Sequence, residues 1–368
     1  MKFIFIVITM LVVIIGANFY IFFRLWHLIP LFPASRTLLV CLGIVLVVFP
    51  FLPMGLGPHF PFGISSVMYR IGCSWLIIML YLTLLFLILD IIAATGVLPL
   101  HKYMYHSWMG FGVLSLFMIA LMGGANIKYH IKKRVEFTIK TEKQIDTTDP
   151  LKIVAIADLH LGYGVGIKEF RRWVRLINRE NPDLVLISGD AFDNRVRPMV
   201  ERNFAAVFGE IKSKYGIFMA LGNHEYISNI SEGIEFLNSS GVTVLRDRVA
   251  LVDGSFYVVG RDDRSNTQRK TVAELVEPLD HTKPIVLLDH QPYHLEDAVR
   301  AGVDLYFAGH THDGQVFPIS WITKAMYELS HGYLKKGATH FYVTSGIGLW
   351  GGKFRIGTQS EYVVINIK

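Results

Sequence analysis

The stretch "LKIVAIADLH", residues 151–160, places an acidic residue and a histidine directly after a short apolar run. The run is rich in β-branched and aliphatic side chains and predicts a buried strand over Lys152–Ala157. Asp158 and His160 lie two positions apart just beyond that strand. A single D-x-H sequence is more often structural than functional, so its meaning depends on the rest of the chain.

The same arrangement recurs along the second half of the chain. A first strand is predicted through the alternating residues 135, 137 and 139, and further strands over 184–188, 217–221, 243–245, 256–259, 285–288, 305–308 and 341–344. Helical patterns lie between several of them, at 168–179, 200–214, 234–238 and 271–279. This alternation predicts an α/β domain, in which the loops after different strands converge on one crevice.

Side chains that can bind metal ions follow these strands, in "GDAFD" (189–193), "GNHE" (222–225), "DH" (289–290) and "GHTH" (309–312). The candidate ligands combine imidazole nitrogens with carboxylate and amide oxygens: Asp158, His160, Asp190, Asn223, His290, His310 and His312. Such a mixed set suits Mn²⁺, Fe or Zn²⁺ better than Ca²⁺. We expect extended backbone to point both members of each i, i+2 pair to the same cluster. Glycines before Asp190, Asn223 and His310 are expected to permit close packing.

The first 126 residues are of a different kind. They hold five basic residues and one acidic residue, whereas the remainder holds 31 basic and 29 acidic residues. Uncharged apolar runs at 3–23, 37–56, 71–100 and 108–125 are each long enough to cross a bilayer, so we expect four transmembrane helices. The first run is too long for a signal-peptide core and is expected to be retained. The second, interrupted by Pro50 and Pro53, is also open to interpretation as a re-entrant segment.

The positions of lysine and arginine orient these helices. An even number of spans places on one side Lys2, Arg70, Lys128, Lys132, Lys133 and Arg134, and on the other only Arg24, Arg36 and Lys102. The positive-inside rule then places the C-terminal half in the cytoplasm. Both cysteines, Cys41 and Cys73, lie in predicted spans and fit either compartment. Asp90 is open to two interpretations, an intramembrane functional group or a residue at the membrane interface.

Together, the series D-x-H, G-D-x-x-D, G-N-H-[DE], H and G-H-x-H resembles the calcineurin-like metallophosphoesterases. The resemblance covers about residues 130–368 and implies a four-layer α/β-β/α sandwich. The chain is similar in particular to bacterial membrane-associated phosphodiesterases whose last motif reads G-H-T-H-G-G-Q. Asp313 departs from that motif, and Ala157 stands where a serine is common before the first Asp of the series. We therefore expect a membrane region at 1–126, a basic linker with a first strand at 127–149, and a metallophosphoesterase domain at 150–368.

The resemblance implies a site for two divalent metal ions, with Mn²⁺ expected and Fe or Zn²⁺ as alternatives. The first ion would be held by Asp158, His160 and His312, and the second by Asn223, His290 and His310. Asp190 would bridge both ions. His224 would act at the leaving oxygen as a proton donor or as a stabiliser of the transition state, with Asp193 in support. Two roles stay open for Arg355, a contact to substrate phosphate or a structural ion pair. The loop Arg261–Ser265 is expected to shape the pocket.

The predicted function is hydrolysis of a phosphodiester or pyrophosphate bond by a membrane-anchored enzyme. Residues 150–368 hold 25 basic and 25 acidic residues, so no excess of positive charge is available for a nucleic acid. The short tether and the basic cluster at 128–134 favour an anionic membrane surface and a lipid-linked substrate. The alternative is a catalytically silent sensor or scaffold whose membrane half carries the function. The intact ligand set and His224 argue against that alternative.

Overall fold

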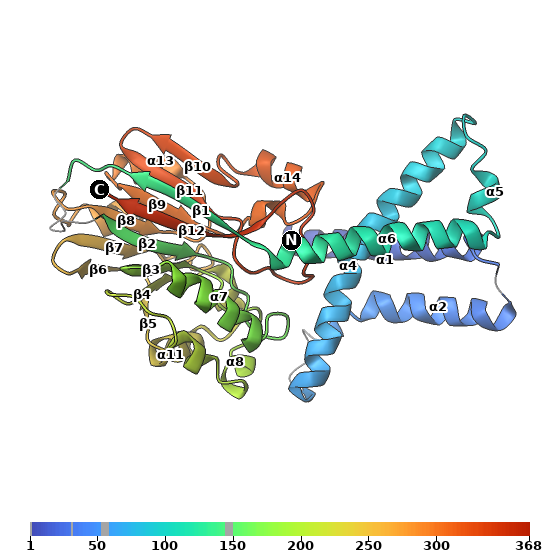
Figure 1. Ribbon diagram of the computed structural model, residues 1–368, viewed down its shortest axis with the longest axis horizontal. Coiled ribbons are helices and arrows are strands. Elements are labelled where there is room, and N and C mark those ends of the chain that lie inside the picture. Colours follow the sequence, from blue (N-terminus) through green and yellow to red (C-terminus); the bar gives the residue numbers. More distant parts are fainter. Residues whose placement is uncertain (1, 31, 53–58, 144–149) are drawn as a thin grey trace. The chain divides into compact units, whose positions relative to one another are not determined.

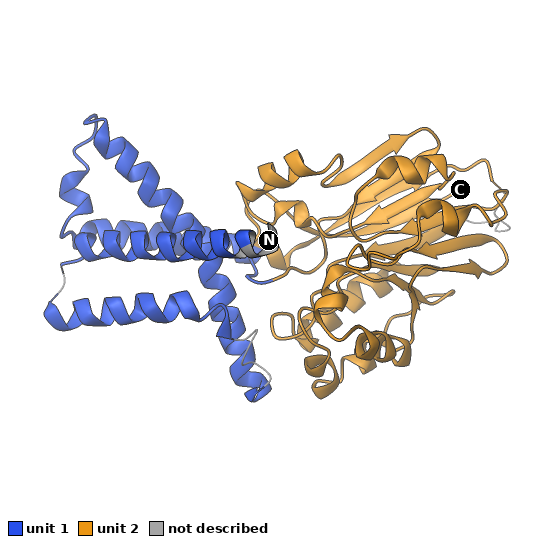
Figure 2. Cartoon of the chain, turned by 180° about the vertical axis from the view of Figure 1, so that it is seen from behind, with its two compact units in different colours: residues 1–127, 351–354 blue, residues 128–350, 355–368 orange. Residues whose placement is uncertain are grey.

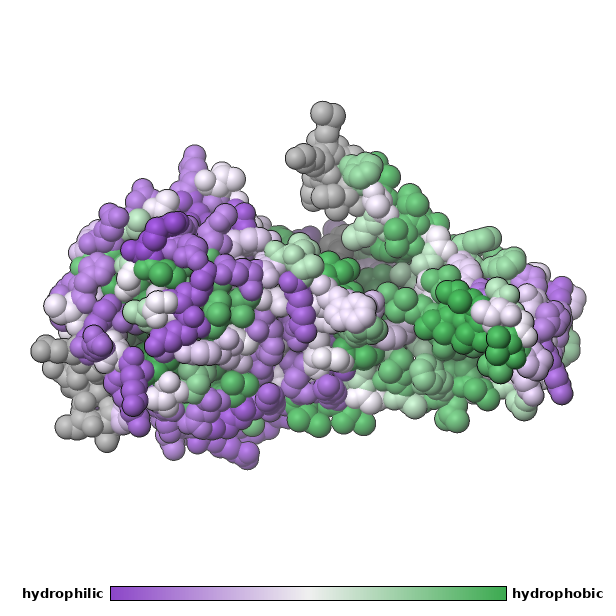
Figure 3. Space-filling view, turned by 90° about the horizontal axis from the view of Figure 1, so that it is seen from above, coloured by the Kyte–Doolittle hydropathy of each residue, from purple (hydrophilic) through white to green (hydrophobic). Residues whose placement is uncertain are grey.

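The computed structural model describes residues 2–30, 32–52, 59–143 and 150–368. The chain forms two compact units (Figure 2). The helical unit consists of residues 1–127 with 351–354, and the sheet unit of residues 128–350 with 355–368. Hydrophobic residues dominate the visible surface of the helices, and hydrophilic residues dominate that of the sheet unit (Figure 3). The two units are described separately below.

The N-terminal part of the chain is helical. Its helices are α1 (Lys2–Leu28), α2 (Pro33–Val48), α4 (Phe62–Ala94), α5 (His101–Met104) and α6 (Trp108–His130) (Figure 1). Three segments are long and apolar enough to cross a membrane: Ile8–Leu28, Phe62–Ala94 and Trp108–His130. The third predicted run therefore begins nine residues earlier than expected. The second forms the 16-residue α2, shorter than the roughly 20 residues that span the hydrocarbon core. Pro53 lies outside the described residues.

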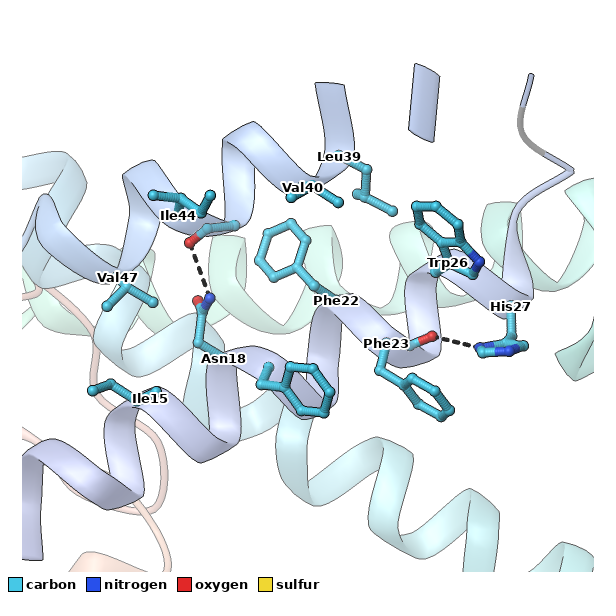
Figure 4. Close-up of a pocket in the computed structure, with 12 residues that line it drawn as sticks. Ile15, Asn18, Phe22, Phe23, Trp26, His27, Leu39, Val40, Ile44 and Val47 are labelled. Atoms are coloured by element: carbon cyan, nitrogen blue, oxygen red, sulfur yellow. Dashed lines mark hydrogen bonds between the residues drawn. The ribbon is translucent and has the colours of Figure 1, made fainter. Parts of the chain in front are cut away.

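Polar side chains join the first helices to one another. Asn18 of α1 donates from Nδ2 to the carbonyl oxygen of Gly43 in α2 at 3.0 Å (Figure 4). Its Oδ1 accepts from Trp75 Nε1 of α4 at 3.1 Å. Phe22 packs where a side chain at Gly43 would lie. Asn18 therefore has its amide bonded on both sides, which suits a polar group between apolar helices.

Asp90 is part of an ion pair within the helical unit. Its Oδ1 lies 2.8 Å from a guanidinium nitrogen of Arg24, and its Oδ2 accepts from the Tyr20 hydroxyl at 2.5 Å. The Arg24 side chain is buried, whereas that of Asp90 is partly exposed. Both residues lie in the last turns of their helices. The pairing supplies a structural reason for an acidic residue in an apolar run.

The sheet unit contains two six-stranded sheets. In order across the first sheet the strands are β1 (Lys132–Ile139), β12 (Ser360–Ile367), β2 (Leu151–Ile156), β3 (Leu184–Ser188), β4 (Ile217–Ala220) and β5 (Val242–Leu245). Across the second they are β10 (Gly332–Lys336), β11 (Thr339–Val343), β9 (Leu305–Ala308), β8 (Ile285–Leu288), β7 (Phe256–Gly260) and β6 (Arg248–Val252). Strands β2 to β5 are mutually parallel, as are β7 to β9. Their carboxyl ends therefore meet along one edge of each sheet.

Three hydrophobic cores separate the layers of the sheet unit. The central core lies between the sheets and includes Leu186 of β3 and Phe307 of β9. A second core packs the first sheet against α7 (Ile167–Arg179), α8 (Arg197–Glu201), α9 (Phe204–Phe208) and α11 (Ile230–Ser239). A third packs the second sheet against α12 (Val272–Val276) and α13 (Leu295–Arg300). The layers thus run helices, sheet, sheet, helices.

The predicted helix over 200–214 is wrong. Two short helices, α8 and α9, occupy this region, because Asn203 between them adopts a left-handed conformation with φ of 52°. Strands β6, β10 and β12 and the helix α14 (Ile319–Met326) were not predicted. The predicted polar turn over 140–150 lies in part outside the described residues, since residues 144–149 are not described.

Candidate active site

The loops after β2, β3, β4, β8 and β9 bring their polar side chains together. Three groups of side chains have ligand atoms within 4.8 Å of one another: Asp158–His160–His312, His160–Asp190–His224 and Asp190–His290–His310. The groups share His160 and Asp190, so they form one continuous cluster. All seven predicted ligands lie in or beside it, since Asn223 contacts two of the histidines.

The first half of the cluster comes from the ends of β2 and β9. His160 Nε2 lies 3.2 Å from His312 Nε2, and His312 Nε2 lies 3.9 Å from Asp158 Oδ1. Asp158 is held by the backbone N–H of His310, which donates to both of its carboxylate oxygens at 3.0 and 3.2 Å. This N–H ties the loop after β9 to the loop after β2.

The second half comes from the ends of β4, β8 and β9. Asn223 Oδ1 lies 3.2 Å from His290 Nε2 and 2.9 Å from His310 Nδ1. His290 Nδ1 lies 2.7 Å from the carbonyl oxygen of Ser188, an acceptor that requires a proton on Nδ1 and leaves Nε2 facing the cluster. His310 and His312 thus enter opposite halves of one continuous cluster, so both members of this i, i+2 pair do meet the same cluster.

Asp190 lies between the two halves. Its Oδ2 is 3.7 Å from His160 Nε2 on one side and 3.1 Å from His290 Nε2 on the other. Its Oδ1 accepts from the backbone N–H of His224 at 2.9 Å. The Asp190 carboxylate is therefore fixed by the start of α10 (Asn223–Ile227) while its second oxygen faces both halves.

The backbone at the cluster is left-handed rather than extended. The expected reason for the pairing of Asp158 with His160 is therefore wrong, although both side chains do reach the same group. Five predicted ligands have positive φ, between 44° and 70°: Asp158, His160, Asp190, His310 and His312. Non-glycine residues rarely adopt this conformation, which tends to concentrate at functional sites.

The predicted close approach at the glycines is confirmed. A Cβ on Gly222 would lie 2.2 Å from Asp190 Oδ1, and one on Gly189 would lie 2.4 Å from His290 Nδ1. Gly189 also has φ of 78°. Any side chain at these positions would displace the cluster, so the chain needs glycine there.

The electrostatics of the cluster fit a cation. Burial lowers the pKa of His160 and His312 well below the usual value and that of His310 to about 4, which keeps these imidazoles neutral. Burial opposes ionisation of Asp190, but His290 and His224 outweigh it and hold the pKa of Asp190 well below its usual range. Neutral imidazoles with a carboxylate are the forms that bind divalent metals.

A second observation also fits a metal ion. His160 Nδ1 and His312 Nδ1 are buried and make no hydrogen bond within the described part of the chain. The two Nε2 atoms face each other at 3.2 Å, a contact in which one ring can donate to the other, depending on the tautomer. A cation held by both Nε2 atoms would take the place of this contact, so the residues present fit the group that the sequence predicts.

His224 lies at the rim of the cluster. Its ring centroid is 4.6 Å from that of His160 and 6.3 Å from that of Trp350, and its Nδ1 contacts the carbonyl oxygen of Asp193. Burial lowers the pKa of His224, but Asp190, Asp193 and the Asp193 carbonyl outweigh it and raise the pKa overall. A proton is therefore available on this ring beside the cluster. Trp350 was not predicted, because an exposed aromatic residue in a loop carries no spacing signal.

Glu225 was missed by the sequence analysis. Its buried carboxylate accepts from four backbone N–H groups, those of Asp190, Ala191, Phe192 and Gly222, at 2.7 to 3.2 Å. Burial raises the pKa of Glu225 to about 7, while the four donors favour its ionised form. Glu225 thus joins the loop after β3 to the loop after β4. Its place directly after Asn223-His224 was the available signal.

Arg355 has a structural role. It is buried and donates to the carbonyl oxygens of His312 and Ser345 and to the hydroxyl of Ser360, the first and last at 2.6 and 3.1 Å. Neither predicted alternative describes this arrangement, in which backbone oxygens take the place of a phosphate or a carboxylate. By holding the His312 carbonyl, Arg355 supports the left-handed segment that carries this predicted ligand.

The loop after β7 is held by Asp289. The guanidinium groups of Arg261 and Arg269 lie 3.1 and 3.0 Å from its carboxylate oxygens. Arg264 is exposed, with its guanidinium 3.8 Å from the centre of the Tyr293 ring. Tyr293 in turn bonds Tyr327. Two arginines of this loop are therefore structural, and the third lies at its surface.

Comparisons with known proteins agree on one family. A family model described as calcineurin-like phosphoesterase matches residues 151–314. An uncharacterised metallophosphoesterase of Campylobacter jejuni is 32% identical over 266 residues, which cover 70% of this chain and 68% of the relative. A transmembrane protein with metallophosphoesterase domain from Danio rerio is 33% identical over 252 residues, 64% of this chain and 57% of the relative. The chain therefore spans less than two thirds of the Danio rerio relative.

Among solved structures, a 5′-nucleotidase precursor from Thermus thermophilus is similar to part of this chain. It shares 16% identity, covers 59% of this chain and 54% of its own, and has a TM-score of 0.37. A likeness this low supports no argument about activity.

Proposed function

Since this chain belongs to the calcineurin-like metallophosphoesterase family, we propose that it is a membrane-anchored phosphohydrolase with two divalent metal ions. Hydrolysis of a phosphodiester or pyrophosphate bond is the proposed reaction, and Mn²⁺ the proposed metal. The membrane anchor is supported by three helices long and apolar enough to cross a bilayer. The complete donor set in the sheet unit disfavours a catalytically silent scaffold.

We assign the two halves of the cluster to the two ions. One ion is assigned to Asp158, His160 and His312, and the other to Asn223, His290 and His310, with Asp190 shared. Bound dications would supply charge that activates water and stabilises the phosphoryl group as it reacts. The observation that carries this proposal is the place of Asp190 Oδ2, 3.7 Å from His160 and 3.1 Å from His290.

His224 is proposed to hold and deliver a proton to the leaving oxygen. Its Nδ1 contacts the Asp193 carbonyl, which requires a proton on that nitrogen and leaves Nε2 to face the reacting group. Despite burial, Asp190, Asp193 and the Asp193 carbonyl raise the pKa of His224 above its usual value, a direction that favours the proton-donor role. Asp193 acts as a positioning residue through this contact, because it orients the ring.

Metal analysis of the purified full-length protein tests the proposal. We expect two equivalents of divalent metal per chain and hydrolysis of bis-p-nitrophenyl phosphate that a chelator abolishes and Mn²⁺ restores. One equivalent or fewer at full activity would overturn the two-ion assignment. Full metal content without hydrolysis of any phosphodiester or pyrophosphate would favour the silent scaffold.

We further propose four membrane crossings with the sheet unit in the cytoplasm. Two contacts support this number: Asn18 with Trp75 and Arg24 with Asp90, at 3.1 and 2.8 Å. From the first contact to the second, the residue number rises in both helices, so α1 and α4 run in the same direction. The chain between them therefore has to cross the membrane in the opposite direction. Asn18 also bonds Gly43 of α2, the only helix described in that interval. A reporter fused after Lys368 should read as cytoplasmic, and cleavage of the sheet unit by external protease in intact cells would contradict it.

The proposed substrate is a lipid-linked phosphoester. Helix α6 ends at His130 and β1 begins at Lys132, so one residue separates the last apolar helix from the first sheet. This tether is shorter than the linker expected from the sequence and keeps the sheet unit near the bilayer. In nanodiscs, the full-length protein should cleave a lipid-linked diphosphate with higher kcat/KM than its deacylated, soluble counterpart. Equal kcat/KM for both would reject this substrate class and leave the metal assignment intact.

A further inference from the structure

Helix α14 turns its apolar side outward. Successive residues of an α-helix lie about 100° apart, and Ser320 is the residue of α14 that is buried against the sheet unit. Ile322 and Met326 lie on the opposite side of the helix and Trp321 on the adjoining flank, with exposed fractions of 57%, 61% and 66%. A surface helix of a soluble domain normally has the reverse arrangement.

Phe317 extends this apolar face beyond the helix. It is 40% exposed, and its ring packs edge-on against Trp321 with centroids 4.8 Å apart. We call Phe317, Trp321, Ile322 and Met326 the α14 face. The sheet unit exposes other large apolar residues, such as Val200 and Ile227, but these are scattered along the chain. A contiguous apolar patch indicates a surface that is covered in the working protein.

The α14 face lies near the candidate active site in sequence and in space. The segment between them includes the short helix η2 (His312–Gly314), which contains the predicted ligand His312. A Cβ on Gly314 would lie 2.5 Å from the backbone of Ser320, so η2 and α14 are in direct contact.

The same face is linked to the point where the chain leaves the membrane. Phe317 donates its N–H to the carbonyl oxygen of Ile356 at 2.8 Å, and Thr358 bonds the carbonyl oxygen of Gln315. Three residues beyond Ile356, Gln359 donates to the carbonyl oxygens of Lys128 and Ile131 at the end of α6. All of these residues belong to the sheet unit. A few hydrogen bonds thus join α14 to the end of an apolar helix that can span a bilayer.

We propose that α14 is an interfacial helix, whose face of Phe317, Trp321, Ile322 and Met326 lies among the lipids of the bilayer that α6 enters. Continuity with the end of α6 favours this occupant, because the chain leaves the membrane helix there and hydrogen bonds within the sheet unit connect that point to the segment that carries α14. The side chains agree, since tryptophan and phenylalanine favour the region between headgroups and acyl chains. This inference goes beyond the proposed function, because it concerns membrane contact and not hydrolysis.

Lipid photolabelling of the unmodified full-length protein tests the proposal. The protein is placed, one copy per nanodisc, in anionic phospholipid that includes a lipid with a diazirine on its acyl chain, and adducts are mapped by mass spectrometry. We expect adducts in the segment 317–326 as well as in α1, α4 and α6. Val200 and Ile227 are matched controls, because they are 59% and 61% exposed and should stay unlabelled.

Labelled spans with an unlabelled segment 317–326 would overturn the proposal. Protection of this segment from a water-soluble footprinting reagent, without lipid adducts, would mean that protein covers it, and would also overturn the proposal. The variant W321S/I322S should lose the adducts, whereas V200S should keep them. Lipid adducts and footprinting protection are both measured without an activity assay. If the protein hydrolysed no substrate, the proposed function would be refuted, but this test of α14 would still be valid.

Discussion

The helical unit and the sheet unit bury ionisable groups in different ways. In the helical unit the buried Arg24 meets Asp90, and the phenol of Tyr20 completes the contact. In the sheet unit, imidazoles gather around Asp190, and in the described part of the chain His160 Nδ1 and His312 Nδ1 are buried without a hydrogen bond. A charge that pairs with one partner within the chain indicates a structural role. A cluster of several donors around one carboxylate indicates a ligand site, and the predictions below test this distinction.

The largest effect is expected for Asp190→Asn. An amide shared between two cations lacks the charge that holds both, so we expect kcat to fall by at least about 10³-fold with loss of bound metal. Hydrolysis assays and metal analysis of the same sample measure both. Asp280→Asn is the control, since Asp280 is exposed in a turn, and it should change neither value. Wild-type metal content and rate in the Asp190 variant would show that the cluster, like the helical ion pair, is structural.

Replacement of His224 by Ala should act on turnover alone. We expect bound metal to stay unchanged and kcat to fall by roughly 10²-fold, because a general acid contributes about this much. The loss should be larger for substrates whose leaving group is a poor one, since these need the proton most. A series of aryl phosphodiesters with different leaving groups measures this dependence. An equal loss for every leaving group would argue against the proton-donor role.

The ion pair of the helical unit should matter to stability and little to catalysis. In a double-mutant cycle of Arg24→Met and Asp90→Asn, each single change leaves one partner without its counterpart. We expect a coupling of about 1 kcal/mol, measured by thermal unfolding in detergent. Hydrolysis of a soluble diester should stay within roughly twofold of wild type in all three variants. A loss of activity as large as that of Asp190→Asn would break the distinction between the units.

The last prediction concerns an ion pair within the sheet unit, whose loss is expected to affect stability and not hydrolysis. Glu361 accepts from His331 Nε2 at 3.0 Å and also from Tyr342, Thr344 and Ser345. Burial opposes ionisation of Glu361, but His331 and these donors outweigh it and lower the pKa of Glu361. Burial likewise opposes the charge of His331, but Glu361 outweighs it and raises the pKa of His331.

The directions of these two pKa shifts define the pH range in which the pair of Glu361 and His331 stabilises the fold. A lowered carboxyl pKa stabilises the fold above its unfolded value of about 4.3, and a raised histidine pKa stabilises it below an unfolded value of about 6.5. Glu361→Gln should therefore cost about 1 to 2 kcal/mol between these values, and less as rising pH deprotonates His331. Thermal unfolding of the variant and wild type from pH 4 to 9 measures the difference. A difference independent of pH would show that hydrogen bonding alone, without the ion pair, explains it.

Sequence patterns predicted those features of the fold and the site that depend on neighbouring residues. The strand before Asp158, the glycine before Asp190 and the polar residues after each strand all follow from neighbours in the sequence, and the structure brings them together. Nonlocal pairing was not predictable in this way. β12 lies between β1 and β2 because residues 360–367 pair with residues more than 200 positions away. No spacing in the segment itself indicates that partner.

Two features of the site also depend on such long-range contacts. The carboxylate of Glu225 bonds N–H groups of the loop after β3, more than 30 residues upstream, so its role appears only after the two strands pair. The left-handed backbone of Asp158 and His310 is imposed by the packing of one loop on the other. The segment 317–326 was likewise not predicted to be an exposed apolar helix, and the structure shows that Phe317, Trp321 and Ile322 are exposed there.

The left-handed backbone at five predicted ligands would make the amount of this protein depend on the supply of metal in the cell. Each such residue costs roughly 1 to 2 kcal/mol, so the loops that carry them fold against their local preference. A metal that binds only the folded form offsets this cost by mass action. Copies that remain empty would open more often at these loops and would be degraded sooner. In a metal-starved cell the amount of this enzyme would then fall before its rate per molecule did, so that its abundance would record the metal supply.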